Sequence, residues 1–224
     1  MAKLDKARRM LFPYCTPLLL VTGLAVAPYA FAGTQAEEPL SASVQAALQK
    51  NVADTASPRA GFVSESEAKD WLEEMSQRLL SRIPDKQERV NFLRTVHYEA
   101  TRAGLQPELV LGLIQVESAF RKYAVSTAGA KGYMQVMPFW LKLIGTADQN
   151  LFNLRTNLRY GCTIFRFYLT MEKGDYFRAL GRYNGSLGQP DYPRMVVQTW
   201  ERAWASATRR ADAKPVKTST GRQG

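Results

Sequence analysis

Apolar side chains recur every three or four residues from Glu65 onward, and the two-residue alternation that is typical of half-buried strands is almost absent. This period places the apolar positions on one face of a helix. The first run stops at Pro84. It carries Trp71, Leu72, Met75, Leu79 and Ile83. Asp85 followed by Glu88 resembles a capping box and predicts the start of a second helix, which Gly104 ends.

Five further helices are predicted from the same period and from prolines and glycines at their ends. Their expected ranges are 107–117, 138–145, 150–171, 175–183 and a last helix from residue 193 that carries Trp200 and Trp204. We therefore predict one all-α domain over residues 65–205, with at most a small hairpin in the loop from Ser126 to Gln135. Residues 33–64 are predicted to form a flexible linker with a short helix at 44–48, and residues 206–224 a disordered basic tail.

The first 32 residues have the pattern of an export signal. Basic residues come first, an apolar stretch runs from Leu18 to Ala27, and Ala30-Phe31-Ala32 is a small-x-small cleavage pattern. Cleavage near Ala32-Gly33 would give a periplasmic protein with no stable membrane span. The alternative is an uncleaved anchor, because residues 11–32 are long enough to cross a bilayer, although three prolines in this stretch favour cleavage. Cys15 lacks the small-residue context of a lipoprotein site, so lipidation is not predicted.

The charge is concentrated at the ends of the chain. The formal net charge is +10, and removal of residues 1–32, with four Lys/Arg and one Asp, leaves +7. The tail from Ala205 contributes +4 of this, so the body carries only about +3. This distribution does not indicate a nucleic-acid groove, but a basic surface would favour an anionic envelope polymer.

The small number of cysteines and histidines, two and one, excludes several kinds of chemistry. Cys162 would be alone after cleavage, so no internal disulfide is possible, and it lies in an apolar helical pattern. His97 is the only histidine, and its position predicts a helix packing residue. A metal site and a nucleophilic triad are therefore not expected, and no cofactor is predicted.

Glu117 is the strongest candidate for a catalytic residue. It follows the apolar run Val110 to Val116, and no Asp or Glu occurs from Ser118 through Ala147. A carboxyl group among apolar residues resists ionisation, so its pKa rises. A carboxylic acid that keeps its proton near neutral pH can protonate the leaving oxygen of a glycosidic bond. The alternative is an ordinary surface carboxylate at a helix end.

Downstream segments supply groups that suit a sugar site. The segment from Ser126 to Pro138 contains small residues and two glycines, which predict a tight loop. Its Gln135 amide can both donate and accept hydrogen bonds, while Met134 is expected in the core. Tyr183-Asn184-Gly185 later places a phenol and an amide before a glycine break.

These motifs resemble the catalytic domain of soluble lytic transglycosylases, which show E-S, G-L-M-Q and A-Y-N motifs in this order. The corresponding residues are Glu117-Ser118, Gly132-Tyr133-Met134-Gln135 and Tyr183-Asn184-Gly185. The spacing from Glu117 to Ser126, Gln135 and Met137 is similar too. The resemblance covers residues 97–204 and implies a lysozyme-like helical domain with the architecture of goose-type lysozyme and SLT domains. Thr127, Tyr133 and Arg182 depart from the family pattern, and none of these departures removes an expected catalytic group.

The resemblance also implies a reaction on peptidoglycan. Glu117 would act as the single acid and base that cleaves the bond between N-acetylmuramic acid and N-acetylglucosamine and forms a 1,6-anhydro ring. Ser126, Gln135, Met137 and Tyr183 would line the sugar subsites, with Tyr183 holding either the Glu117 carboxyl group or the N-acetyl group. Asn184 would be a ligand or a helix C-cap, and Ser118 would touch substrate or cap backbone groups.

Two other functions stay open at this point. A hydrolase of the same fold would need a second carboxylate within about 10 Å of Glu117. The candidates by position are Asp148, Glu172, Asp175 and Asp191. A non-catalytic peptidoglycan-binding scaffold in an envelope assembly would have no need of the acid. A possible assembly partner would bind the linker or the basic tail.

Overall fold

The computed structural model describes residues 35, 37–53 and 65–206 of the 224-residue chain. The predicted export signal, much of the predicted linker and nearly all of the predicted tail lie outside these residues. The described part is helical. Its α-helices are α1 (Ala42–Ala53), α2 (Glu65–Leu79), α3 (Lys86–Arg102), α4 (Pro107–Ser118), α5 (Phe139–Ile144), α6 (Leu154–Met171), α7 (Tyr176–Asn184) and α8 (Asp191–Thr199), and a π-helical turn follows at Trp200–Trp204.

The all-α prediction is confirmed for the described residues, with three differences in detail. The loop expected to hold a small hairpin has two isolated antiparallel bridges, Val125 to Lys131 and Lys131 to Val136. Helix α6 begins at Leu154 because Asn153 caps it through a side-chain bond to the Thr156 amide, so the predicted start at residue 150 is too early. Helix α8 begins two residues before Pro193, since proline is well tolerated in the first turn of a helix.

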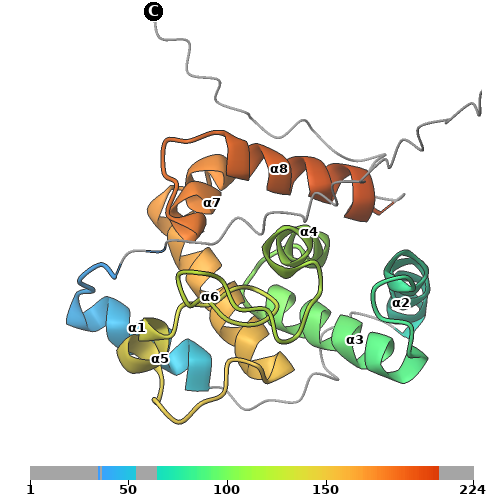
Figure 1. Cartoon of the computed structure of the whole chain (residues 1–224), viewed down its shortest axis with the longest axis horizontal. Helices are drawn as coiled ribbons and strands as arrows, with labels where there is room; N and C mark the ends of the chain where they lie inside the picture. The colour runs from blue at the N-terminus through green and yellow to red at the C-terminus, as the bar shows by residue number, and fades with distance from the viewer. Residues whose placement is uncertain (1–34, 36, 54–64, 207–224) are drawn as a thin grey trace, which may run out of the picture.

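Helix α4 lies in the middle of the molecule, with α8 along one side and α3 along the other (Figure 1). Its sequence from Leu109 through Ile114 is entirely apolar, and the residues from Pro107 through Ile114 are all buried. A helix without a polar face is stable only where neighbours cover it completely. Here α3, α8 and the π-helical turn supply that cover, so the end of α4 is held in a fixed place.

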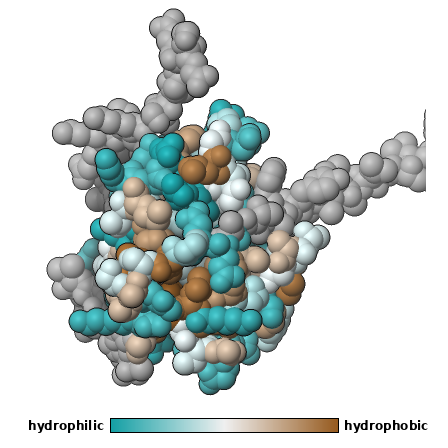
Figure 2. Space-filling model, turned by 90° about the vertical axis from the view of Figure 1, so that its left-hand side faces the viewer, coloured by the Kyte–Doolittle hydropathy of each residue, from teal (hydrophilic) through white to brown (hydrophobic). Residues whose placement is uncertain are grey.

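Helix α1 is longer than the predicted helix at 44–48 and packs against α5 and α6. Leu48 and Val52 are buried on this contact, and the Gln45 side chain donates a 2.7 Å hydrogen bond to the Leu143 carbonyl oxygen. Just before α1, the Gln35 amide oxygen accepts a 2.8 Å bond from the Trp140 indole. This part of the predicted linker is therefore docked. Figure 2 shows this side of the molecule, where apolar side chains gather in the middle of a largely hydrophilic face.

Two sequence features have structural roles away from any site. His97 is buried and contacts Trp71 edge-on with ring centroids 5.0 Å apart, as expected of a packing residue. Cys162 is buried against Met134, which confirms the apolar interpretation of both residues. Within residues 37–53 and 65–206, none of the helices has the length and apolarity that crossing a membrane requires.

Candidate active site

Glu117 lies in the last turn of α4, where the helix ends abruptly. Ala119 and Phe120 both have positive φ angles, 49° and 64°, and the Ala119 amide closes the helix by donating to the Gln115 carbonyl oxygen. Left-handed backbone angles are uncommon for residues with a Cβ atom and are held here by packing, since Phe120 is buried against Phe92 and Trp204. The chain therefore turns away directly after the carboxylate and enters the loop that carries the second motif.

The Glu117 carboxyl group is enclosed by protein, with only 2% of the residue exposed. Its Oε1 accepts a hydrogen bond from the Tyr192 hydroxyl group, at the start of α8, while its Oε2 is buried without a hydrogen-bond partner. Desolvation raises the pKa of Glu117 to about 8, and the bond from Tyr192 opposes this rise. The carboxyl group thus keeps its proton at neutral pH, and the surface alternative for Glu117 is wrong.

Three buried side chains from different helices hold the loop backbone from Lys131 to Met134. Asn157 of α6 accepts from the Met134 amide at 2.8 Å and donates to the carbonyl oxygens of Lys131, at 2.8 Å, and Leu151, at 2.9 Å. Ser118 donates to the Tyr133 carbonyl oxygen at 2.7 Å. Tyr183 of α7 donates to the Met134 carbonyl oxygen, also at 2.7 Å. The loop is therefore fixed relative to α4, α6 and α7 through its own main chain.

Gly132 and Gln135 explain why the loop needs its motif. Gly132 has φ +76°, and a Cβ atom there would lie 2.4 Å from the Asn157 amide nitrogen and 2.6 Å from the Leu151 carbonyl oxygen. Only glycine allows both the backbone angle and the Asn157 clamp. Gln135 has φ 48°, and its side-chain nitrogen donates to the carbonyl oxygens of Gly132 and Ala124 at 2.8 and 3.2 Å. The motif thus builds a rigid loop beside Glu117.

This geometry corrects several expected roles. The Tyr183 hydroxyl group donates to the loop, so it does not hold the Glu117 carboxyl group. Ser118 is buried and donates to the carbonyl oxygens of Ile114 and Tyr133, which matches backbone capping rather than substrate contact. Asn184 is not the left-handed C-cap, because Gly185, with φ 80°, takes that position. The buried Asn184 side-chain nitrogen has no hydrogen-bond partner, as a ligand-binding group would.

The remaining predicted sugar-binding residues lie on the same loop. Ser126 and Met137 are half-buried. The Ser126 hydroxyl oxygen accepts from the Ala130 amide at 3.0 Å and closes the turn between them. Gln135 is buried, and its amide nitrogen donates to carbonyl oxygens of the loop. Ser126 and Met137 are therefore the more accessible members of this group.

Tyr192 is the site residue that the sequence analysis missed. It is 2% exposed, and its phenol donates to Glu117 across 75 residues of sequence. Burial and the neighbouring Glu117 charge raise the pKa of Tyr192 well above its ordinary value, so it stays a hydrogen-bond donor. Tyr192 lies four residues before Val196, on the apolar period of the last helix, which predicts burial. Nothing in that period says that its hydroxyl group meets Glu117.

The four residues considered as a second catalytic carboxylate are exposed, cap a helix or pair with arginines. Asp175 caps α7 through the Arg178 amide, and Asp148 is exposed. Burial alone would raise the pKa of Glu172, but hydrogen bonds from Arg182 and Arg178 outweigh it and hold this pKa below its ordinary value. Asp191 is exposed beside Arg194, although it directly precedes Tyr192. Across the described ranges, no group of three His, Cys, Asp or Glu residues is placed to hold a metal ion.

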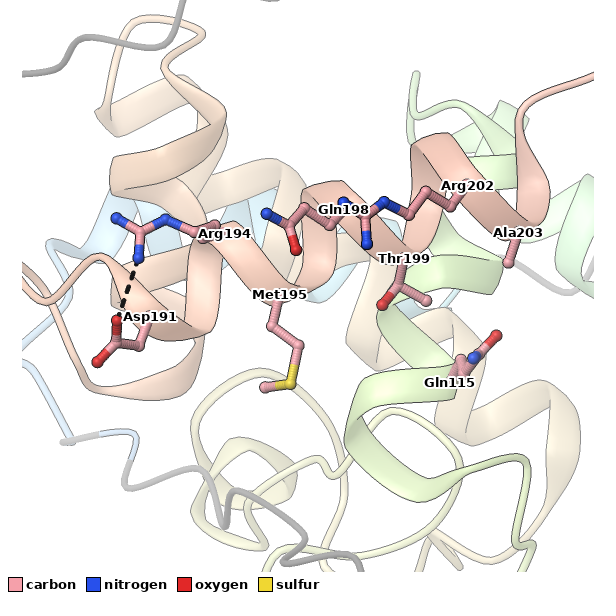
Figure 3. A pocket seen from close by; sticks show the side chains of 8 residues that line it. All are labelled: Gln115, Asp191, Arg194, Met195, Gln198, Thr199, Arg202 and Ala203. Atoms are coloured by element: carbon pink, nitrogen blue, oxygen red, sulfur yellow. Dashed lines mark hydrogen bonds and ion pairs between the residues drawn. The ribbon is translucent and has the colours of Figure 1, made fainter.

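A groove of about 420 Å³ runs along α8 on the side that faces α4 (Figure 3). It begins at Asp191, next to Tyr192, and its opposite wall includes Gln115, two residues before Glu117. Gln115 is fixed by a 2.8 Å bond from the Trp204 indole to its side-chain oxygen. The groove therefore lies between α8 and α4, the helix that carries Glu117.

A family model, the transglycosylase SLT domain, matches residues 94–193. The chain contains an SLT-type domain. The match begins within α3 and ends within α8, so it includes Glu117, the clamped loop, Tyr183 and Tyr192. The described helices α1 and α2 lie outside the matched part of the SLT-type domain.

Named relatives align with parts of this chain. The membrane-bound lytic murein transglycosylase C of Actinobacillus pleuropneumoniae serotype 5b is 53% identical over 47 residues, 21% of this chain and 13% of that protein. The protein of the same name from Histophilus somni strain 2336 is 39% identical over 117 residues, 43% of this chain and 31% of that protein. The chain thus spans less than a third of the length of these curated relatives.

One solved structure is also similar to this chain. It is an inactive mutant of the lytic transglycosylase Slt from Pseudomonas aeruginosa, with 21% sequence identity and a TM-score of 0.41. The similarity covers 59% of this chain and 25% of the Slt chain.

Replacement of Tyr192 by Phe tests the contact that the sequence did not reveal. The bond from Tyr192 lowers the pKa of Glu117, so its removal should move that pKa above 8. A lost hydrogen bond to a charged group costs about 1.5–3 kcal/mol, which corresponds to roughly one to two pH units. The 13C chemical shift of the Glu117 carboxyl carbon, followed against pH, measures this change. Tyr183→Phe is the matched control, because the Tyr183 hydroxyl group donates to the Met134 carbonyl oxygen and not to Glu117. An equal change in the Glu117 pKa in both variants would contradict the assignment.

Proposed function

We propose that this protein is a peptidoglycan lytic transglycosylase that cleaves the bond between N-acetylmuramic acid and N-acetylglucosamine, with Glu117 as its single acid and base. The observation that carries the proposal is the enclosed Glu117 carboxyl group, with a pKa of about 8, inside an SLT-type domain. At neutral pH such a group is a ready proton donor. The proposal is also supported by the relatives' name, lytic murein transglycosylase.

The two carboxyl oxygens support different parts of this role. Oε1 accepts the hydrogen bond from Tyr192, whereas Oε2 has no partner in the protein. The acid proton therefore belongs on Oε2, the oxygen that would donate it to the glycosidic oxygen. When the proton leaves, Tyr192 remains bound to the new carboxylate and stabilises its charge.

The proposed reaction needs no water and no second carboxylate. Glu117 donates its proton to the glycosidic oxygen, the bond from that oxygen to C1 breaks, and the muramic acid's N-acetyl group assists at C1. The Glu117 carboxylate then takes the proton of the C6 hydroxyl group, whose oxygen attacks C1 and closes the 1,6-anhydro ring. Because the attacking group belongs to the same sugar, its effective concentration is high. Glu117 ends the cycle protonated, as it began.

Further groups near the loop suit a carbohydrate. Tyr123 is 69% exposed, and its ring centroid lies 5.6 Å from that of Phe152. Phe152 directly follows Leu151, whose carbonyl oxygen accepts a hydrogen bond from Asn157. Lys122 and Lys131 lie over these two rings. The two rings would contact the apolar faces of sugars. The Asn184 amide would add a buried hydrogen-bond donor for the substrate.

Mass spectrometry of the muropeptides that the chain releases from purified peptidoglycan tests the proposal. We expect products that end in 1,6-anhydro-muramic acid and weigh one water less than reducing-end products, and we expect none from Glu117→Gln. Reducing-end products would show a hydrolase instead, for which Asp191, beside Tyr192, is the first carboxylate to replace by Asn. Binding without any product from the native chain would favour the non-catalytic scaffold.

The place of action follows from the proposed substrate. Peptidoglycan lies in the bacterial envelope, so we propose export by the predicted signal in residues 1–32 and a periplasmic location. An envelope assembly partner is part of the same proposal, with the segment before α2 and the basic tail as its expected binding regions.

A further inference from the structure

The segment that runs from α8 into the π-helical turn contacts α4 at both of the segment's ends. At its start, Tyr192 donates to the Glu117 carboxyl group. At its end, the Trp204 indole donates a 2.8 Å hydrogen bond to the Gln115 side chain, and the Trp204 ring meets Phe120 edge-on with ring centroids 5.4 Å apart. Gln115 precedes Glu117 by two residues and Phe120 follows it by three. Trp204 therefore contacts the chain on both sides of the carboxylic acid.

Arg78 of α2 fixes the π-helical turn from the side away from the family-matched region. Its Nη1 donates to the carbonyl oxygens of Ala203, at 3.0 Å, and Ala205, at 3.2 Å. The last carbonyl groups of a helix have no partner within it, and a cation at this end also matches the negative end of the helix dipole. Both α2 and the turn lie outside residues 94–193, so this contact is not part of the matched SLT-type domain.

The turn and α4 approach each other too closely to move independently. A Cβ atom at Gly112 of α4 would lie 3.0 Å from the Cα atom of Trp200, so the two backbones are in direct contact. Trp204 and Phe120 are also buried. Protein interiors are packed as densely as organic crystals, so a shift of the turn passes to the end of α4 instead of being absorbed between them.

We propose that Arg78 is a positioning residue for Glu117, which acts by anchoring the π-helical turn whose Trp204 braces the end of α4. Where it concerns catalysis, this inference rests on the proposed function. The hydrogen bonds of Arg78 go to the turn and to Glu74, so its effect on Glu117 passes through Trp204. With the anchor in place the carboxyl group stays enclosed; without it the turn moves and water reaches the acid.

Arg78→Met in the full chain tests the inference, because methionine cannot donate to the two carbonyl oxygens. Desolvation is the largest influence on the pKa of Glu117, so admitting water should lower that pKa from about 8 by about one unit. The 13C chemical shift of the Glu117 carboxyl carbon against pH measures the change. Burial holds the pKa values of Tyr183 and Tyr192 well above their ordinary range, so neither phenol titrates near pH 8.

Two further readouts separate positioning from a loss of stability. The pH above which peptidoglycan cleavage declines should move down with the pKa of Glu117, which a fold that is merely less stable would not cause. Arg78→Lys keeps a cation beside the carbonyl oxygens, so it should restore most of the native pKa and of the native pH profile.

Glu74→Gln and Arg82→Met are the matched controls. Glu74→Gln removes the ion pair of Arg78 and leaves both carbonyl bonds in place, while Arg82→Met removes an exposed positive charge just beyond α2. Both variants should keep the native pKa of Glu117. A folded Arg78→Met protein with the native pKa, or an equal fall in either control, would overturn the inference.

Trp204→Phe keeps the test decisive if Arg78→Met does not fold. Phenylalanine retains a ring against Phe120 but loses the donor to Gln115, so the pKa of Glu117 should again fall, and an unchanged pKa would reject the brace. The pKa is measured without substrate. A native chain that cleaves no peptidoglycan would therefore contradict the proposed function alone, while the pKa comparison still decides the role of Arg78.

Discussion

Replacement of Glu117 by Gln is expected to lower the rate of peptidoglycan cleavage by at least about 10³-fold. General acid–base groups contribute roughly 10²–10⁴-fold each, and here one residue performs both proton transfers. Glutamine keeps the size and the Tyr192 contact of Glu117 but cannot release a proton. Initial rates of muropeptide release from sacculi, at matched concentrations of folded protein, measure the loss.

The same variant should change how stability depends on pH. The pKa of Glu117 rises from 4.5 to about 8 on folding, so between these values the folded chain keeps a proton that the unfolded chain releases. The stability that this proton gives is fully present below pH 4.5 and is lost as the pH rises toward 8. Urea unfolding should therefore find Glu117→Gln more stable than the native chain at pH 8, with a smaller difference at pH 4.5. Activity of the native chain should fall above pH 8 as the acid ionises.

Glu108→Gln is a matched control for both measurements. Glu108 lies on the same helix, is buried, and accepts a 3.0 Å hydrogen bond from the Trp71 indole. Loss of the Glu108 carboxylate should change the free energy of unfolding and leave activity per folded molecule unchanged. A Glu117→Gln protein that retains more than a tenth of native activity would contradict the single acid and base.

The sequence was informative about local structure because helices and caps depend on nearby residues. The apolar period predicted the helix that ends in Glu117, and the acid-free stretch after it agrees with the enclosure of that carboxyl group. The glycine of the second motif predicted a tight loop, and the Asn157 clamp shows the reason for it. These features needed no knowledge of how the helices pack.

Contacts between distant segments were beyond such reasoning. The Tyr183 and Tyr192 hydroxyl groups lie at the ends of two successive helices, and which of them meets Glu117 depends on how α7 and α8 pack on α4. The same holds for α1, whose short apolar pattern predicted a helix but not its contact with α5 and α6. Resemblance assigned roles to the motif residues, and three-dimensional packing reassigned several of them to the loop.

Replacement of Glu99 by Gln is expected to destabilise the fold by about 3–5 kcal/mol, because it breaks a buried ion cluster. Glu99 of α3 has a fully buried side chain. Arg159 of α6 donates to both of its oxygens at 2.8 Å, Arg102 donates at 3.1 Å, and Arg155 lies at 3.5 Å. Urea unfolding of the native and variant chains at pH 7 measures the difference in the free energy of unfolding.

The size of this effect follows from what the substitution leaves behind. Arg159 is 5% exposed, so loss of the Glu99 carboxylate removes the charge that its buried guanidinium contacts through two 2.8 Å hydrogen bonds. Glu74→Gln is the matched control, because Glu74 pairs with Arg78 at a spacing of four residues on a partly exposed helix face, where a pair contributes about 0.3–0.5 kcal/mol. If Glu99→Gln costs no more than Glu74→Gln, the cluster does not hold α3 to α6. Adding Arg159→Met to Glu99→Met should recover part of the loss of Glu99→Met alone, since the double variant leaves no unpaired charge at that position.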